Sequence, residues 1–569
     1  MPLPIRLIER EAHARLEVGR TTISRRTAWA MVLFFLAVIV LVPLVRCVRD
    51  VRAYVAGQRD SAWPQAFDIF RSPPRAITAA WQAEGSLVQR MLVVNRILLG
   101  DIGVYQATLK DESIFVGAMT PPVQEAMTGL LGGGTERVYV GRDGWLFYRP
   151  DLDYVMGHPF LEPTQLARRA SQVKDGALPQ SDPRPAILDF HRQLASRGIR
   201  LIVMPTPAKP TIHPEQFSPE CRPGGPPLEN ASFREFKEGL EREGVLVFDP
   251  AETLKDYAAN GPVYLAADTH WRPEAMEHAA EGLQRFIEKH VRLPEAPPVA
   301  YQRETQEVTN TGDLAVALRL PAGQTLFPPE TVQTQQILTP QGGLWRATRE
   351  ADVLILGDSF SNMYSLDGMG WGDTAGLVEQ VSCLLQRPVD AILRNGSGAY
   401  ATREILDREL ARGMDRLAGK RVVVWQFATR ELASGDWKRI DVQLRQAPPA
   451  RFFVPPDGKT ITVTGTVEAV SFVPRPRTVP YRNHILALHL ADVEAGKEGI
   501  ADEQAVVYMW SMRDNVWTAA AHYRPGDCVT LTVRPWADVA AEYERFNRSE
   551  LRNEALQLEE PCWGETEKP

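Results

Sequence analysis

A serine that could act as a nucleophile, Ser359, stands in the segment GDSF at 357–360. The apolar run VLIL comes directly before it and predicts a buried strand, and the residues after it are compatible with a helix. In an open parallel sheet, such a turn lies at the carboxyl edge, where ligands bind. Because a serine hydroxyl is a poor nucleophile at neutral pH, this chemistry requires a histidine base and a carboxylate that orients it.

The segment DTHW at 268–271 supplies such a pair, with one residue between Asp268 and His270. We expect this segment to form a loop between a strand at 263–265 and a helix that Pro273 opens. Two alternatives stay open at this point. Asp268 could cap the helix and leave His270 on the surface, or both could ligate a metal ion, although no second histidine stands at a useful spacing.

A third segment, RNGSGAY at 394–400, offers hydrogen-bond donors. Asn395 lies in a glycine-rich turn, and its amide could point at the negative oxygen that forms when a serine attacks a carbonyl. A plain turn uses the same residue types for backbone angles with positive φ, so this alternative is also open. Together the three segments are more informative than each alone, because all of them are expected in one α/β region.

Short β-rich runs alternate with helical stretches between about 136 and 430. This order is typical of parallel β-α-β units in a three-layer α/β domain. The runs LIVM, VLIL and VVVW are apolar on consecutive residues, as expected of strands covered on both faces. We therefore predict an α/β domain at 131–445, preceded by a helical region at 46–130.

The pattern changes at Pro448, after which strand-like segments are separated by Pro and Gly turns. We predict a small β-barrel or β-sandwich over 446–569, with an OB-like barrel as one form, behind a Pro-rich linker near 445–458. This domain is expected to bind carbohydrate or a partner and to take no part in bond-making; a purely structural appendage is the alternative. Four aromatic residues favour sugar stacking, although some must be core: Tyr508, Trp510, Trp517 and Trp536.

Residues 28–45 form an apolar segment without a charge, which is long enough to cross a bilayer. We expect an uncleaved single-pass anchor, because Arg46 follows directly and no small-residue cleavage site stands there. Residues 1–27 are then a cytoplasmic tail, and everything after residue 45 lies outside. A buried core helix is the alternative.

Composition excludes several other classes of protein. The 569 residues carry 64 Lys and Arg against 71 Asp and Glu, a net charge of −7 that offers no broad basic surface for nucleic acid. The five cysteines contain no CxxC pair, which disfavours structural zinc. In an oxidising compartment the four beyond Cys47 could pair in three ways, of which Cys221–Cys383 with Cys528–Cys562 keeps each bridge within one expected domain.

The sequence also resembles a known family, the alginate O-acetyltransferases of the AlgX and AlgJ type, over roughly residues 90–435. Six motifs occur in the order of the family's SGNH-hydrolase-like domain: GRDGWLFY (141–148), MPTPAKPTIHPEQF (204–217), DTHW (268–271), GDLAVALRLP (312–321), LILGDSFS (354–361) and VVVWQFATREL (422–432). In ordinary SGNH esterases the Asp and His follow the serine, whereas here they precede it, as in the acetyltransferases. This order favours a transferase.

The resemblance implies a nucleophile at Ser359 that forms an acetyl-serine, a base at His270 and an orienting acid at Asp268, with no metal and no cofactor. Substrate-binding or oxyanion roles would fall to five residues in matching segments: Tyr364, Asn395, Tyr400, Trp425 and Arg430. Gln426 stands where an acidic residue is expected after the tryptophan.

The implied activity is acetylation of hydroxyls on an exported polysaccharide, by a protein of the inner (cytoplasmic) membrane whose catalytic domain is periplasmic or otherwise extracytoplasmic. The implied partners are the polysaccharide acceptor and a multispanning membrane acyltransferase that supplies acetyl groups. One alternative is an SGNH-type polysaccharide deacetylase or esterase that uses water as the acceptor. Another is a non-enzymatic exopolysaccharide-binding scaffold, which an intact Ser-His-Asp set disfavours.

Overall fold

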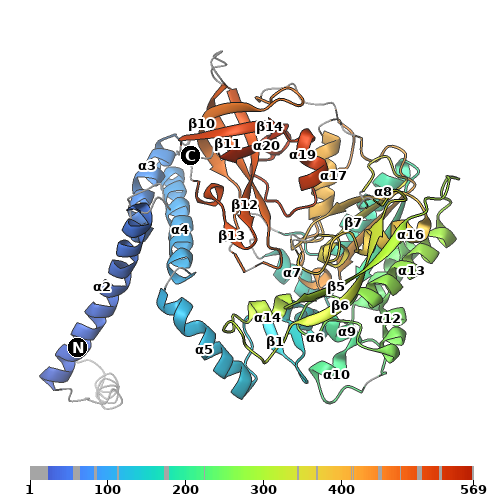
Figure 1. Cartoon of the computed structure of the whole chain (residues 1–569), viewed down its shortest axis with the longest axis horizontal. Helices are drawn as coiled ribbons and strands as arrows, with labels where there is room; N and C mark the ends of the chain where they lie inside the picture. The colour runs from blue at the N-terminus through green and yellow to red at the C-terminus, as the bar shows by residue number, and fades with distance from the viewer. Residues whose placement is uncertain are drawn as a thin grey trace, which may run out of the picture. The chain divides into compact units, whose positions relative to one another are not determined.

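The computed structural model describes residues 24–566 apart from 56–64, 83–85, 112–113, 172–178, 223, 343–344, 346, 367–368, 397, 412, 414, 446–451, 475, 478, 496–502 and 524–527. Contacts divide the chain into two units, residues 1–123 and 124–569 (Figure 1). The expected cytoplasmic tail at 1–27 and the expected linker at 445–458 lie largely or partly outside the described residues.

The first unit is helical. Its longer helices are α2 (Arg25–Val55), α3 (Ser72–Gln82) and α4 (Leu87–Asp111), and α5 (Ile114–Leu131) begins in it. The expected membrane span at 28–45 falls within α2, where the side chains of 37–43 are outside the described residues. Among the helices as far as they are described, none combines the length and the apolar composition needed to cross a bilayer. The predicted transmembrane helix is therefore not supported.

The second unit contains a five-stranded parallel sheet in the order β4-β3-β9-β7-β8. The strands are β3 (Arg200–Thr206), β4 (Leu246–Val247), β7 (Val353–Gly357), β8 (Asp390–Leu393) and β9 (Val422–Ala428). All residues of β7 and β9 are buried, which explains why both read as uninterrupted apolar runs. Because the strands are parallel, the segments that follow them all emerge at one edge.

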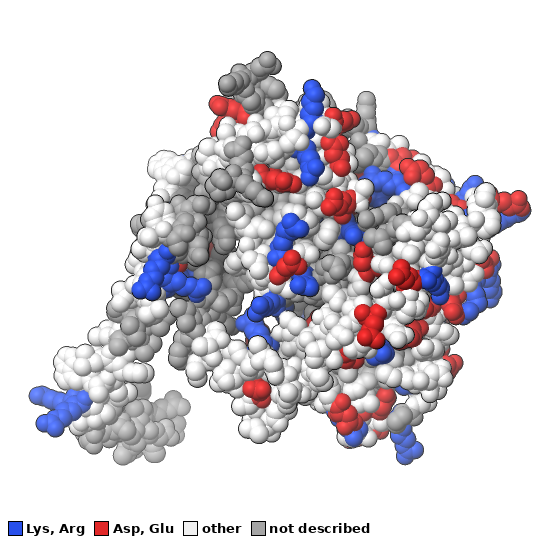
Figure 2. Space-filling model, viewed as in Figure 1, with Lys and Arg blue, Asp and Glu red and all other residues white. Residues whose placement is uncertain are grey.

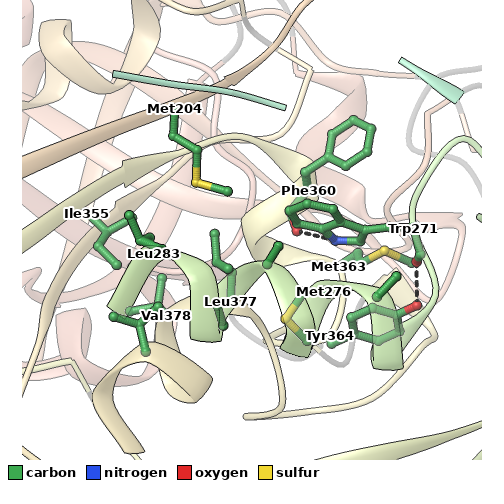
Figure 3. Close-up of a cluster of buried hydrophobic side chains, with 14 of the residues drawn as sticks. Met204, Trp271, Met276, Leu283, Ile355, Phe360, Met363, Tyr364, Leu377 and Val378 are labelled. Carbon is green, nitrogen blue, oxygen red and sulfur yellow. Dashed lines mark hydrogen bonds between the residues drawn. The ribbon is translucent and has the colours of Figure 1, made fainter. Parts of the chain in front are cut away.

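Helices cover both faces of this sheet, so the domain has the three layers that the sequence predicted. Alternate strand residues separate two cores: Ile355 and Val424 face α13 (Pro273–His290) and α16 (Leu377–Leu385). Leu354 and Val423 face the other layer, which contains α8 (Pro183–Ser196), α11 (Phe233–Arg242) and α17 (Ala401–Ala411). Figure 3 shows the first core, in which Ile355 and Met204 of the sheet face Leu283 of α13 and Val378 of α16.

Two antiparallel hairpins lie outside the main sheet. The first is the hairpin of β1 (Val138–Val140) and β2 (Leu146–Tyr148), whose turn places Asp143 and Gly144 at positive φ. The second hairpin pairs β5 (Gln302–Asn310) with β6 (Glu330–Leu338). The expected strand at 263–265 forms only a bridge between Tyr264 and Trp271, directly before α13.

The C-terminal region is a barrel, so of the two predicted forms the sandwich is wrong. Five strands pair in the order β11-β10-β14-β15-β12, and a further pairing of β11 with β12 closes the ring. These strands are β10 (Ile461–Val470), β11 (His484–Ala495), β12 (Glu503–Arg513), β14 (Cys528–Pro535) and β15 (Pro561–Thr566). Among the described strand pairs of the barrel, β12 and β15 are parallel and the others are antiparallel. A five-stranded barrel of this kind is the architecture of OB-folds.

The aromatic residues that could have stacked on sugars are engaged in packing within the chain. Trp510 lies edge-on to Trp563 and Phe546, and Tyr508 lies edge-on to Trp536. Trp517 donates its indole N–H to the carbonyl of Pro474 at 2.8 Å. Tyr508, Trp510 and Trp536 thus pack between the outer face of β12 and residues 536–563, whereas Trp517 packs against the core of the α/β domain.

Charged side chains and cysteines occur in both units. Acidic and basic side chains are interspersed over the face shown in Figure 2, as the small net charge of −7 leads one to expect. All five cysteines lie within the described residues and all are free thiols there. The proposed domain boundaries at 130/131 and 445/446 remain predictions, and residues 124–569 form one compact unit.

Candidate active site

Ser359 is the first residue of α15 (Ser359–Asn362), directly after β7. Asp358 caps this short helix by accepting a hydrogen bond from the backbone N–H of Phe360 at 2.9 Å. The turn is compact because Gly357 has no side chain: a Cβ there would lie 2.6 Å from Ser361 Oγ. The sequence thus places the serine hydroxyl at the carboxyl edge of the sheet.

The structure brings Ser359, His270 and Asp268 together. Ser359 Oγ lies 2.8 Å from His270 Nε2, and His270 Nδ1 lies 2.7 Å from Asp268 Oδ1. An ionised carboxylate can only accept, so Nδ1 carries the imidazole proton and leaves Nε2 free to accept one from the serine. This is the geometry in which a histidine can deprotonate a serine.

Asp268 is fully enclosed and accepts four N–H groups. Oδ1 also accepts the backbone N–H of His270 at 3.0 Å, and Oδ2 accepts the backbone N–H of Asp313 at 2.9 Å and the indole N–H of Trp371 at 3.0 Å. Burial alone would raise the pKa of Asp268, but the hydrogen bond and charge of His270 and these N–H groups lower it to about 2. The carboxylate is therefore ionised at any pH near neutrality.

His270, the partner of Asp268, is more basic than an ordinary histidine. Burial alone would lower the pKa of His270, but the hydrogen bond and the negative charge of Asp268 outweigh it and raise the pKa above its ordinary value. Asp313 packs beside the pair and accepts the backbone N–H of Thr269 at 2.7 Å. Burial and the charge of Asp268 raise the pKa of Asp313 to about 6.

Lys209 holds the loop of Asp268 and His270 through hydrogen bonds to its backbone. Its ammonium group is buried and donates to the backbone carbonyls of Leu146, Ala266 and Asp268 at 2.6, 2.7 and 3.0 Å. Burial lowers the pKa of Lys209 to about 7. This side chain ties the loop of Asp268 to the hairpin of β1 and β2.

Gln426 locks the serine turn from β9. Its Oε1 accepts the backbone N–H of Asp358 at 2.9 Å and the hydroxyl of Ser361 at 2.7 Å. Its Nε2 donates to Thr206 Oγ1 and Asp358 Oδ1, both at 2.9 Å. The amide accepts with its oxygen and donates with its nitrogen, whereas an ionised carboxylate at this position could only accept.

Arg430 follows β9 at the same edge and contacts the residue next to the serine. Its guanidinium lies 5.6 Å from the ring centre of Phe360 and 5.2 Å from that of Tyr148, and it donates to Asp151 Oδ1 at 3.0 Å. Burial alone would lower the pKa of Arg430, but the charges of Asp151 and Asp358 raise it. Asp151 Oδ2 is buried and has no hydrogen-bond partner among the described residues.

Tyr364 and Trp425 lie in the cores. Tyr364 is fully buried and donates its hydroxyl to the carbonyl of Trp271 at 2.7 Å, and the indole of Trp271 donates to the carbonyl of Phe360 at 3.1 Å (Figure 3). Tyr364 thus braces the loop that carries His270. Trp425 is also fully buried, on the opposite face of the sheet, and donates to the carbonyl of Ala399 at 3.1 Å.

Tyr400 and Asn395 follow β8. The ammonium of Lys438 lies 4.0 Å from the ring centre of Tyr400. Asn395 is buried; its Oδ1 accepts the amide N–H of Asn362 at 3.0 Å, and its Nδ2 lies 3.2 Å from Met369 Sδ. The structure therefore brings Arg430 and Asn395 to the serine's edge of the sheet, and it places Tyr364 and Trp425 in packing roles.

Asp268, His270 and Asp313 have ligand atoms within 4.8 Å of one another, close enough to hold a metal ion. Asp268 Oδ1 and Oδ2 already accept N–H groups, and the two ring nitrogens of His270 contact Asp268 and Ser359. This hydrogen bonding accounts for the arrangement without an ion.

Sequence reasoning missed the residues that position Asp268. Lys209 and Asp313 lie inside two of the motifs that carry the resemblance, so their place in a motif was the available signal. Gly312 permits the close approach of that segment, because a Cβ there would lie 2.2 Å from the carbonyl oxygen of Ala267. Trp371 had no comparable signal, because only the folded chain brings it to Asp268.

Residues 138–429, just over half of the chain, match the family model described as "SGNH hydrolase-like domain, acetyltransferase AlgX". The chain belongs to this family. The match begins at β1, ends at β9 and contains all of Asp268, His270 and Ser359. The AlgX-type domain thus accounts for the α/β part of the second unit, and the barrel lies beyond it.

Curated relatives of this AlgX-family chain carry the name "Probable alginate O-acetylase AlgJ". The protein from Azotobacter vinelandii is 26% identical over 239 residues, 41% of this chain and 56% of the relative. The protein from Pseudomonas aeruginosa is 29% identical over 208 residues, 36% of this chain and 47% of the relative. The chain spans about half the length of the curated relatives it matches. Among solved structures, the O-acetyltransferase domain of Pseudomonas putida AlgJ has 21% identity and a TM-score of 0.40, covering 52% of this chain and 92% of that one.

Proposed function

We propose that this protein is an extracytoplasmic O-acetyltransferase that transfers acetyl groups to hydroxyls of an exported polysaccharide. The hydrogen-bonded chain from Ser359 through His270 to Asp268, with distances of 2.8 and 2.7 Å, carries the proposal. Membership of the AlgX family and the name shared by the AlgJ relatives supply the reaction class.

In the first half-reaction, Ser359 Oγ attacks the carbonyl carbon of an acetyl donor while His270 Nε2 takes the serine proton. The bond between the carbonyl and the donor's leaving group then breaks, and His270 returns the proton to that group. The product is an acetyl-serine ester. Asp268 stabilises the imidazolium that forms in between, because its carboxylate remains ionised beside Nδ1.

In the second half-reaction, a sugar hydroxyl replaces the donor. His270 removes its proton, the sugar oxygen attacks the acetyl carbonyl, and the proton passes to Ser359 Oγ as the ester bond to serine breaks. Water competes for the same ester. Ser359 is only 6% exposed, which favours an acceptor that is bound and oriented over free water.

Arg430 and Asn395 are the residues we assign to the substrate side. Arg430 keeps a positive charge beside Phe360 and can orient the donor or acceptor. Asn395 accepts a hydrogen bond from Asn362 of α15. We assign it the role of positioning the turn beside which negative charge develops on the carbonyl oxygen. The acetyl donor would be delivered by a multispanning membrane acyltransferase.

The test is a product analysis. The full chain is incubated with 4-nitrophenyl acetate and with each of several candidate polysaccharides, and the acetyl ester on the glycan and the free acetate are both quantified. We expect glycan-bound acetyl ester with at least one polysaccharide. Free acetate alone, with or without glycan, would identify an esterase instead, and binding of glycan with no turnover of the ester would identify a scaffold.

A further inference from the structure

The loop of Arg394 and Asn395 is bonded to both sides of the serine turn. The backbone N–H of Arg394 donates to the carbonyl of Gly357, two residues before Ser359, at 2.9 Å. The side chain of Asn395 accepts from Asn362, the last residue of α15, at 3.0 Å. A shift of this loop would therefore move α15 and the serine that begins it.

The same loop is held from the barrel by one buried asparagine. Asn547 Nδ2 donates to the backbone carbonyl of Asn395 at 3.2 Å, and Asn547 is only 4% exposed. Asn547 is fixed in the barrel, because its own carbonyl accepts the N–H of Ile485 in β11 at 2.8 Å. The next residues continue this pairing, with a parallel bridge between Ile485 and Arg548.

Ion pairs dock the chain on either side of Asn547 onto the α/β domain. Before it, Arg545 pairs with Asp373 at 2.9 Å. After it, Glu550 pairs with Arg408 at 3.4 Å, and both side chains are largely buried. Burial alone would raise the pKa of Glu550, but the charges of Arg548, Arg408 and Arg394 lower it. Buried pairs with several partners impose a defined geometry, since losing one partner leaves a desolvated charge.

We propose that Asn547 is a positioning residue for acyl transfer: it fixes the Asn395 loop, and through Asn362 it fixes the helix that begins at Ser359. This inference rests on the proposed function and assigns the barrel a part in building the active site. It replaces the expectation that the C-terminal domain takes no part in bond-making. Small displacements of a nucleophile cost large factors in rate, so the effect should appear in the chemical step itself.

Two variants of the full chain test the proposal. N547A removes the side chain, and N547D keeps its shape but replaces the N–H donor with an oxygen that faces the carbonyl of Asn395. The matched control is N553A, an asparagine of the same domain whose Oδ1 caps α20 (Glu554–Gln557) by accepting from Ala555 at 3.0 Å. Thermal melting verifies that each variant is folded.

Two rates are measured by intact mass for each protein: acetylation of the chain by 4-nitrophenyl acetate, and labelling of Ser359 by a sulfonyl fluoride. Both reagents are small, so a domain that only bound glycan would leave both rates unchanged. We expect N547A and N547D to lower both rates by about 10- to 100-fold and N553A to stay within about twofold of the unmodified chain.

Labelling rates within about twofold of the unmodified chain for folded N547D would overturn the positioning role. An effect confined to acetyl transfer onto polysaccharide would overturn it as well. Labelling of Ser359 by the sulfonyl fluoride depends on the reactivity of the serine and does not require that the protein transfers acetyl groups. If the unmodified chain is labelled but never acetylated, the proposed function fails, while the labelling rates still decide whether Asn547 positions the serine.

Discussion

Two loops at the carboxyl edge of the sheet support the candidate active site in different ways. The loop of Asp268 and His270 is held from within the α/β domain, by Lys209 beneath it, Trp371 at the carboxylate and Tyr364 behind it. The loop of Arg394 and Asn395 is held in part from the barrel, through the hydrogen bond that Asn547 donates to the carbonyl of Asn395.

The two loops have different tasks: the loop of Asp268 and His270 activates the serine, and the loop of Arg394 and Asn395 holds it in place. All N–H groups that contact the carboxylate of Asp268 come from residues 270–371, so the hydrogen bonds to the acid are made within the α/β domain. The serine turn itself borders a loop whose position depends on a second domain. Variants that act on one loop and not on the other distinguish activation of the serine from its placement.

Removal of the nucleophile should have the largest effect. In S359A, acetylation of the chain by 4-nitrophenyl acetate should fall at least about 1,000-fold, because neither His270 nor Asp268 can replace the lost oxygen. The rate is read by intact mass. S196A, which loses an exposed hydroxyl bonded only to the neighbouring carbonyl of Gln193, is the control. An acetylation rate for S359A equal to that of S196A would place the nucleophile elsewhere.

Neutralising the acid should cost nearly as much and should also shift the pH profile. His270 must be neutral to accept a proton, so the rate should rise as the pH rises through its pKa. Asp268 raises that pKa, and D268N should therefore lower the midpoint while reducing the plateau rate about 1,000-fold. Acetylation rates measured between pH 5 and about 9 test both effects. An unchanged midpoint would show that Asp268 does not control His270.

A charge introduced under the serine turn should give an intermediate effect. Q426E removes two donated hydrogen bonds and places a carboxylate where Nε2 now lies 2.9 Å from Asp358 Oδ1. We expect sulfonyl labelling of Ser359 to slow about 10- to 100-fold at neutral pH and to recover partly in acid, as one carboxyl takes a proton. Q302E, at an exposed glutamine, is the matched change of charge. Labelling of Q426E at the rate of Q302E would show that the amide is not needed.

Loss of one of the four donors to Asp268 should have the smallest effect. W371F keeps an aromatic side chain, although a smaller one, and removes the indole N–H that lies 3.0 Å from Oδ2. The acetylation rate should fall only about three- to tenfold, because three donors remain and one hydrogen bond to a charged group has a modest net value. A loss as large as that of D268N would mean that Trp371 alone keeps the carboxylate in place.

Much of the α/β domain was predictable because its strands are short apolar runs and its functional segments follow them directly. VLIL and VVVW became β7 and β9, and Pro273 opens α13 as expected. Ser359 follows β7 as predicted, whereas His270, 89 residues earlier, lies on a loop outside the five-stranded sheet, beside the bridge between Tyr264 and Trp271.

The rest depended on packing between distant segments, which residue patterns do not encode. In the sequence, an aromatic residue such as Tyr364 or Trp425 can belong either to a binding site or to the core. Only the fold shows that both are fully buried. Tyr508 and Trp510 of the barrel are likewise covered by residues 536–563 of the same chain. Asn547 had no signal at all, because its partner is the backbone of a loop 152 residues earlier.

Peptide mapping of the acetylated chain tests the central claim most directly. The full chain is mixed with 4-nitrophenyl acetate, quenched in acid and digested, and the modified residue is located by fragmentation mass spectrometry. The account predicts a single acetyl ester on Ser359 that disappears when an acceptor polysaccharide is added before the quench, with the acetyl group recovered on the glycan. An acetyl group on another residue, formed equally in S359A and discharged to the same glycan, would contradict it.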